Sequence, residues 1–306
     1  MQGTPESSRA TSSPARRTNR WAAPIGVLCL AALAPACVAN IRPPTIGVDA
    51  PPSSSFSDGR RLIEAAAERQ GLQAWRRAKT VRFQMTDEWK GVLAALGNPW
   101  PAARVKVRME LKVNSFDARA TFLEGEEAGT TWGLQSWRTY VRPAEGPAQF
   151  QEDDDIRFIL PAEQYLLEFP FRALAIEKVM DAGPETVRGV LYDRVFFTWG
   201  SLEAHSEADQ FLAYINRATG RVEKVHYTIR DFAGFATGTI HYADFRDFGG
   251  WWIPLSQAVT GAVDDDPADY LHLITIDEAT VQLDAFPDSE LVVDPSLPVM
   301  FDQKPS

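Results

Sequence analysis

Hydrophobic and polar residues alternate without error along residues 104–113 (RVKVRMELKV). A period of two places the apolar side chains on one face of a strand and the charged ones on the other. The pattern therefore predicts an antiparallel strand with one dry face and one wet face. Similar alternation predicts strands at 81–86 and 117–123, and we expect further strands at 132–141, 156–160, 174–181, 187–199 and about 270–283.

Two longer stretches predict hairpins. Residues 211–230 turn at Ala218-Thr219-Gly220, and residues 237–260 turn at 247–250 (DFGG). In each case, turn-forming residues separate two strand-like runs. Helical spacing predicts one helix that begins near Ser57 or Asp58, and a second, short helix at 161–174 that is broken near Pro170.

These elements predict a single α+β domain over residues 57–286, with one N-terminal helix, a meander of strands and a mid-chain helical insert. A meander with one charged face must cover its other face, either by curling into a barrel or by folding round a helix. The tail at 287–306 contains four prolines and is expected to be extended.

The N-terminus has the pattern of a signal peptide. Residues 1–20 are polar and basic, and residues 21–36 carry no charge. The apolar run is short for a membrane span and contains Pro24 and Pro35. We therefore expect residues 1–36 to be removed on export.

Cys37 follows Ala34-Pro35-Ala36, and this stretch resembles the lipobox of bacterial lipoproteins. The resemblance implies cleavage before Cys37 and acylation of Cys37. The leucine lies one place further from the cysteine than in the usual motif. A plain secretory cleavage site is the alternative. Val38, in place of an aspartate, implies an outer-membrane lipoprotein that faces the periplasm. Residues 37–56, rich in proline and serine, predict the lipid-attachment cysteine followed by a disordered tether.

The net charge of −10 argues against nucleic acid as a partner. Residues 1–36 carry four arginines and one glutamate, so the mature chain would have a charge near −13. Anionic lipid repels such a surface, and we expect membrane attachment through the acyl anchor alone.

Three stretches together resemble the LolA/LolB-like lipoprotein-carrier superfamily: LIEAAAERQGLQAWRRAKTVRFQM, FLAYINRATGRVEKVHYTIRDF and TIHYADFRDFGGWWIPLSQAV. The resemblance covers about residues 60–283 and implies an incomplete antiparallel β-barrel. In that fold the N-terminal helix and the mid-chain insert cover the concave face of a curved up-and-down sheet. It also implies that acyl chains bind against this face.

Candidate lipid-binding residues follow from the inward positions and the insert. They are Val105, Val107, Met109, Leu111, Phe122, Trp132, Leu166 and Phe169. The chain has nine tryptophans and 17 phenylalanines, enough to line a cavity for an apolar ligand or simply to fill a core. The loop at 88–101 is also apolar. Leu93, Leu96 and Trp100 in this loop form either a buried plug or a lip that touches a membrane.

We expect no catalytic residue, metal or cofactor. Nucleophile-elbow, phosphate-loop and zinc-protease motifs are absent from the sequence. His226 and His241 could meet on neighbouring strands, but solvated sheet histidines are the simpler interpretation. The acidic triples 153–155 and 264–266 lack the spacing of a calcium loop and are interpreted as solvated charge.

The sequence thus predicts a non-enzymatic envelope lipoprotein that binds an apolar lipid or acyl group, from a lipid or a lipoprotein, in a half-barrel. Release would require residues 165–169 to move. The alternative is an interaction module with a self-filled core and a protein partner of unknown identity. A hydrolase with an unrecognised site is a third hypothesis.

Overall fold

Fourteen strands form one sheet in the part of the chain that the computed structural model describes, residues 38–47, 53–91, 97–230 and 233–298. Neighbouring strands pair antiparallel throughout. The strands are β1 (Thr80–Trp89), β2 (Arg104–Lys112), β3 (Ala118–Phe122), β4 (Thr131–Gln135), β5 (Arg138–Arg142), β6 (Gln149–Phe150), β7 (Lys178–Val187), β8 (Val190–Thr198), β9 (Phe211–Asn216), β10 (Val222–Thr228), β11 (Thr237–Phe248), β12 (Trp251–Thr260), β13 (His272–Ile276) and β14 (Gln282–Leu283).

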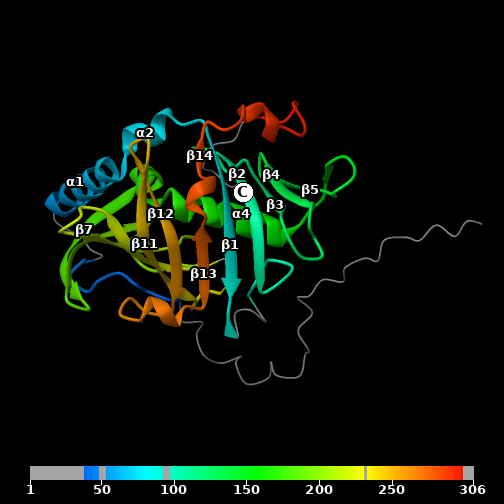
Figure 1. The fold of residues 1–306 in the computed structure, drawn as a ribbon. Helices are drawn as coiled ribbons and strands as arrows, with labels where there is room; N and C mark the ends of the chain where they lie inside the picture. The colour runs from blue at the N-terminus through cyan, green and yellow to red at the C-terminus, as the bar shows by residue number, and fades with distance from the viewer. Residues whose placement is uncertain (1–37, 48–52, 92–96, 231–232, 299–306) are drawn as a thin grey trace, which may run out of the picture. The chain divides into compact units, whose positions relative to one another are not determined.

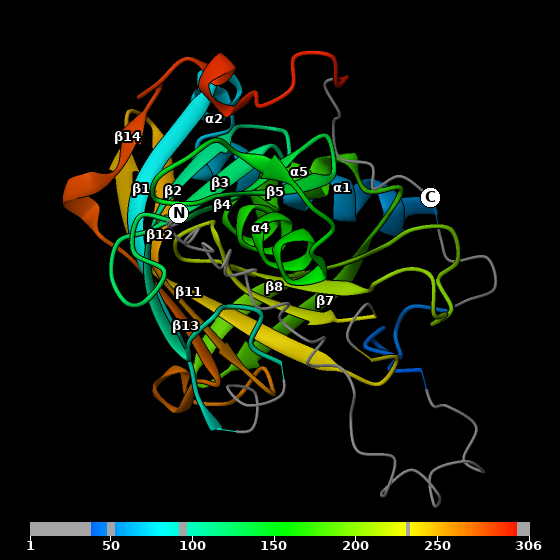
Figure 2. The ribbon, with the colours of Figure 1, turned by 90° about the vertical axis from the view of Figure 1, so that its right-hand side faces the viewer.

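The order of the strands explains why a helix lies inside the curve of the sheet. Strands β1 to β6 run outward to one edge, and β7 to β13 run from the other edge back to the middle, where β13 pairs with β1. The chain must therefore pass from β6 to β7 across the whole sheet. Helices α4 (Asp154–Leu167) and α5 (Phe169–Arg172) make this crossing on the concave side (Figure 1, Figure 2).

Because apolar residues alternate along the strands, the crossing helix covers an apolar face of the sheet. Inward residues of β2, such as Val107 and Met109, pack with Ile159 and Leu160 of α4 in one buried cluster. Buried residues recur along α4 at 156, 159, 160, 161, 163, 164 and 167, and all except Pro161 lie on one face of the helix. This fold confirms the predicted incomplete barrel of the α+β class, with helices over the concave face.

The N-terminal helix is α1 (Ser53–Gln70), and the short α2 (Leu72–Arg77) follows it. Ile63 and Ala66 of α1 pack with Phe169 of α5 and with inward residues of β8 to β10. The helix thus covers the same face as α5, over the half of the sheet that begins at β7. Four short 3₁₀ segments complete the described elements: Ala173–Ala175, Pro267–Asp269, Glu278–Thr280 and Asp288–Leu291.

Three predicted elements were wrong. Residues 270–283 form β13, the 3₁₀ turn Glu278–Thr280 and the short β14 instead of one strand. Residues 156–160 belong to α4 instead of a strand, because Asp153 caps the helix by accepting a hydrogen bond from the Ile156 amide. Residues 132–141 form two strands instead of one. Ser136 and Trp137 both have positive φ angles, 51° and 62°, and make the two-residue turn between β4 and β5.

The segment at 38–47 is docked on the domain, unlike the disordered tether we predicted for 37–56. The Ile41 amide donates to the side chain of Gln210, and the Ala39 amide donates to the Gly234 carbonyl. Ile46 is buried against the convex face of β7 to β9, in a cluster that includes Met180. Apolar residues on both faces of these strands need cover, and this segment supplies it on the convex side.

The C-terminal tail also contacts the sheet. Residues 288–291 form a 3₁₀ turn with Leu291 buried, and the side-chain oxygen of Gln135 accepts hydrogen bonds from the amides of Val293 and Asp294. The described part of the tail is therefore anchored along β4. We predicted an extended segment but not this contact with the sheet.

Candidate functional site

The predicted lipid-binding residues do lie together on the concave side of the structure. Seven of the eight are buried, with exposed fractions between 0% and 6%, and Leu166 is partly buried. Those on β2, β3 and β4 belong to the cluster beneath α4, whereas Phe169 belongs to the cluster beneath α1. Side chains of this protein cover the seven buried residues, so an acyl chain can contact these seven only if their cover moves.

Trp100 lies in the core instead of forming a lip. Its ring stacks with Trp132 at a centroid distance of 5.5 Å and meets Phe122 edge-on. The plug interpretation therefore fits Trp100, and the membrane-lip interpretation does not. Leu93 and Leu96 lie outside the described residues, as does Cys37.

Polar contacts hold the helical crossing in place. The hydroxyl of Tyr242 on β11 donates to the Leu166 carbonyl at 2.7 Å. Glu168 and Arg172 form a buried ion pair at 3.1 Å, and Arg172 also donates to the Ser115 carbonyl at 2.8 Å. Burial raises the pKa of Glu168, because an apolar environment disfavours its charged form. The crossing is thus bound to the sheet by polar as well as apolar contacts.

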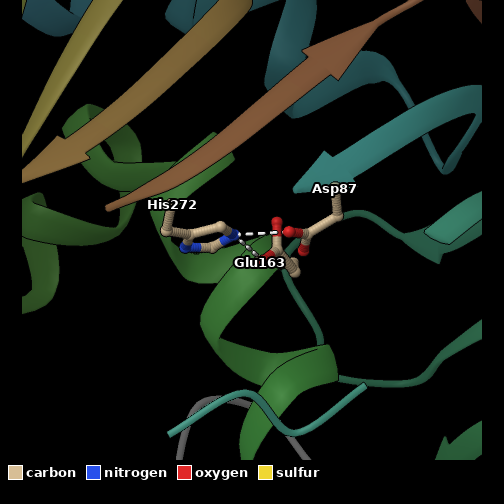
Figure 3. Close-up of side chains that lie close together, drawn as sticks. All are labelled: Asp87, Glu163 and His272. Carbon is tan, nitrogen blue, oxygen red and sulfur yellow. Dashed lines mark ion pairs between the residues drawn. The ribbon is translucent and has the colours of Figure 1, made fainter. Parts of the chain in front are cut away.

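Three buried ionisable side chains meet between α4 and the sheet: Asp87 of β1, Glu163 of α4 and His272 of β13 (Figure 3). The Nε2 atom of His272 lies 2.7 Å from Oδ1 of Asp87 and 3.9 Å from Oε1 of Glu163. Their exposed fractions are only 0%, 6% and 6%. This site joins one residue from the crossing helix to two strands that pair with each other.

Two tryptophans orient this cluster. The Trp100 indole donates from Nε1 to Oδ2 of Asp87 at 2.6 Å. The Trp89 ring stacks on the His272 imidazole with centroids 4.0 Å apart. Burial and the negative charge of Asp87 both raise the pKa of Glu163 well above its usual range. A carboxylate and imidazole set of this kind can exchange protons or hold a metal ion.

The sequence pattern does not predict this cluster, for an identifiable reason. Asp87 continues the inward positions of β1, after Val81, Phe83 and Met85, so it is a charge on an apolar face. Glu163 likewise occupies the buried stripe of α4. That stripe was hidden because we predicted a strand at 156–160. A charge at a core-facing position of a periodic pattern was the available signal.

His226 and His241 do not form a pair. His226 bonds to Thr239, whereas His241 lies between Lys224 and Thr260. Lys224 and His241 are buried, so this part of the polar face is covered instead of solvated as we predicted. The covering segment includes Val263, whose carbonyl accepts a hydrogen bond from Lys224.

The acidic triples have structural partners. Asp153 caps α4, and Asp154 and Asp155 lie in its first turn, where negative charge favours the helix. Asp266 caps the 3₁₀ turn Pro267–Asp269 and pairs with Arg188 at 2.8 Å. These contacts correct the interpretation of both triples as purely solvated charge.

Two open hollows lie elsewhere on the described part of the chain. One, of about 400 Å³, is lined by residues of α1, β8 and β9, including Leu62 and Arg69. The other, of about 560 Å³, is lined by Arg82, Arg108 and Arg119 around Glu110. Neither is lined by a predicted lipid-binding residue. None of the helices in the described residues is long and apolar enough to cross a membrane.

No family model matches this chain, and no curated protein matches it. Among solved structures, it is similar to a DUF1329 family protein from Desulfovibrio piger, with 11% identity and a TM-score of 0.48 over 78% of this chain and 97% of that one. It is also similar to a putative outer membrane lipoprotein-sorting protein domain from Vibrio parahaemolyticus, with 11% identity and a TM-score of 0.48 over 77% and 97%.

A LolA superfamily protein from Nitrosomonas europaea has 12% identity and a TM-score of 0.47 over 78% of this chain and 97% of its own. At these identities and scores the similarities carry no conclusion about ligand, partner or activity.

Proposed function

We propose that this protein is a non-enzymatic envelope lipoprotein, anchored through Cys37 in the outer membrane, that binds an acyl group on the concave face of its sheet. The observation that carries the proposal is that one crossing segment, α4 and α5, covers the apolar concave face of β1 to β4. Because no second sheet packs there in the described part of the chain, movement of this segment would open the binding surface.

The energetics of such an exchange are balanced. Moving α4 away exposes inward residues such as Val107, Met109 and Phe122, which costs about 25 cal/mol for each Å² of apolar surface. An acyl chain that replaces the helix restores that burial and contributes about 0.8 kcal/mol per methylene. In this exchange one apolar cover replaces another. The polar contacts of α4 and α5 with the sheet therefore determine the free energy needed to open the crossing.

The docked segment at 38–47 supports an orientation for the anchored protein. Arg230 donates to the Ala39 carbonyl and to the Gly234 carbonyl, which ties the start of the described chain to the connection between β10 and β11. An acylated Cys37 would therefore hold this end of the sheet close to the membrane. Phe235, in the same connection, is 76% exposed.

The first experiment measures the intact mass of the membrane-extracted protein beside a Cys37→Ala variant, together with the lipids released on denaturation. We expect a mature chain that begins at Cys37 with added acyl mass, and a second, non-covalent lipid near one per chain. A soluble, unmodified chain would contradict the anchor.

The second experiment tests whether the crossing acts as the lid. Tyr242→Phe removes the hydrogen bond to Leu166 and keeps the ring, so opening should be easier by about 1 kcal/mol. We expect the uptake rate of a fluorescent fatty acid to rise about fivefold. Tyr192 lies on β8, in the buried cluster on the convex face of the sheet. Tyr192→Phe is therefore the matched control and should leave uptake unchanged. Equal rates in all three proteins would remove the lid mechanism.

An interaction module with a self-filled core is the second candidate. The observation that favours it is the near-complete burial of the predicted lipid-binding residues by the protein itself. Purified protein that carries no lipid and takes up no fatty acid would make this candidate the better one.

A further inference from the structure

We propose that Asp87, Glu163 and His272 bind one divalent metal ion, with zinc as the best-fitting class, and that the ion fastens α4 to β1 and β13. This inference does not depend on lipid binding. Each residue offers one ligand atom, and these atoms all lie within 4.8 Å of one another. Carboxylate oxygen and imidazole nitrogen are donors that zinc, manganese and iron all accept.

The spacing of the three groups suits an ion. Metal–ligand bonds of about 2.1 Å place neighbouring ligand atoms roughly 3.0–3.5 Å apart. The two separations from His272 Nε2, 2.7 Å to Asp87 and 3.9 Å to Glu163, lie on either side of this range. Changes of less than about half an ångström would bring these two separations into the range. The ligand atoms of Asp87 and Glu163 lie within 4.8 Å of each other. The three side chains converge from different elements in Figure 3.

The hydrogen bonding of the site gives an independent reason. Nε2 of His272 and Oδ1 of Asp87 are close, yet the bond directions do not allow a hydrogen bond, and neither atom has a hydrogen-bond partner in the described residues. Both side chains are more than nine-tenths buried. Buried polar atoms without partners are rare, and a cation in front of their lone pairs would satisfy both.

The charges lead to the same conclusion. Across the described ranges, neither Asp87 nor Glu163 pairs with a lysine or arginine, and His272 is their only ion-pair partner. Two buried carboxylates need either a shared proton or a cation nearby. A divalent ion would neutralise both at once.

The surrounding residues already fix two of the ligands. Trp100 donates to Oδ2 of Asp87, which leaves Oδ1 turned toward His272. Trp89 stacks on the imidazole and sets the plane of the ring. Such outer contacts orient ligands in known metal sites and strengthen binding. Glu163 comes from the crossing helix, so its coordination would couple the ion to the position of α4.

The test measures zinc content and thermal stability of the purified full chain after chelation and reloading with zinc alone. We expect about one zinc per chain. At a hundredfold excess over Kd the melting temperature should rise by about 5 °C or more. Cobalt in place of zinc should give visible absorption bands from a site with oxygen and nitrogen ligands.

Three variants make the test specific. Glu163→Gln keeps the shape and removes a buried charge, so its metal-free form should melt no lower than the metal-free parent, yet it should lose most of the zinc shift. His272→Gln should also lose the shift and the cobalt bands. His205→Gln removes a partly buried histidine outside the cluster and should keep both.

Two results would overturn the proposal. One is less than a tenth of a zinc per chain after reloading. The other is an equal zinc shift in the parent and in Glu163→Gln. Either result would leave the cluster as a proton-sharing contact between α4 and the sheet. The lipid experiments above have separate readouts, so failure of one proposal does not imply failure of the other.

Discussion

Lys224 and His241 lie opposite each other on β10 and β11, with Nζ of the lysine 3.0 Å from Nδ1 of the histidine. An ammonium group can only donate, so Nδ1 must accept, and the histidine is neutral with its proton on Nε2. That proton is donated to Thr260, 2.8 Å away, whose hydroxyl donates to the Ala262 carbonyl. Each group in this series donates a hydrogen bond to the next one. The imidazole can take part only if it is neutral.

This arrangement predicts a pH dependence of stability. Burial, and then the charge of Lys224, lower the pKa of His241 to about 4. The unfolded chain, with a pKa near 6.5, takes up a proton at higher pH than the folded one. His241 therefore contributes stability that is complete above about pH 6.5 and is lost as the pH falls toward 4, by roughly 1–3 kcal/mol.

Urea unfolding at pH 7.5 and at pH 4.5 measures this effect. His241→Gln should lose less stability between the two pH values than the parent does. His205→Gln, at a partly buried site away from His241, should behave like the parent. Equal losses in the parent and in His241→Gln would show that other groups cause the pH dependence.

Arg172→Ala should destabilise the protein by about 3–5 kcal/mol, because it leaves the Glu168 carboxylate buried without its cation. The substitution also removes the contact of the guanidinium with the Phe116 ring, 4.2 Å away. Equilibrium unfolding in urea measures the loss. Arg157→Ala, which breaks exposed ion pairs on α4, should cost less than about 1 kcal/mol. Comparable losses in the two variants would contradict the role of burial.

Gly71→Ala should destabilise the junction between α1 and α2 by about 1–3 kcal/mol. Gly71 has a φ of 103°, and a Cβ there would come within 1.9 Å of the Gly250 carbonyl oxygen. Neither backbone can retreat without moving the turn before β12. Thermal unfolding tests this, with Gly47→Ala as the control, because a Cβ at Gly47 meets nothing within 4 Å. A loss no larger than that of the control would refute the close contact.

Phe235→Glu should leave folding unchanged, because the side chain is mostly exposed, and should weaken association of the acylated protein with liposomes. The expectation follows from the docking of Ala39 beside Gly234, which would keep this end of the sheet near the membrane. Liposome flotation measures the association. Leu191 lies near the start of β8 and is also exposed, so Leu191→Glu is the control and should have no effect. Equal flotation of all three proteins would contradict the orientation.

The sequence was sufficient for the local elements. Strict alternation over 104–113 predicted β2, and the turns at 218–220 and 247–250 predicted two hairpins that the structure confirms. These signals are local, since a period of two and a turn residue act between near neighbours in the chain. The apolar face of β2 also had to be covered, and the pattern alone showed which face that was.

Only the tertiary structure decided which distant segments meet. The pairing of β13 with β1 brings His272 beside Asp87, and the crossing from β6 to β7 places Glu163 between them. No periodic pattern encodes these contacts, because they depend on the order of whole strands in the sheet. The burial of Trp100 and the docking of Ile46 have the same origin: each is an apolar residue in an irregular segment. The sequence shows that such a residue must be buried, and the assembled sheet determines which surface buries it.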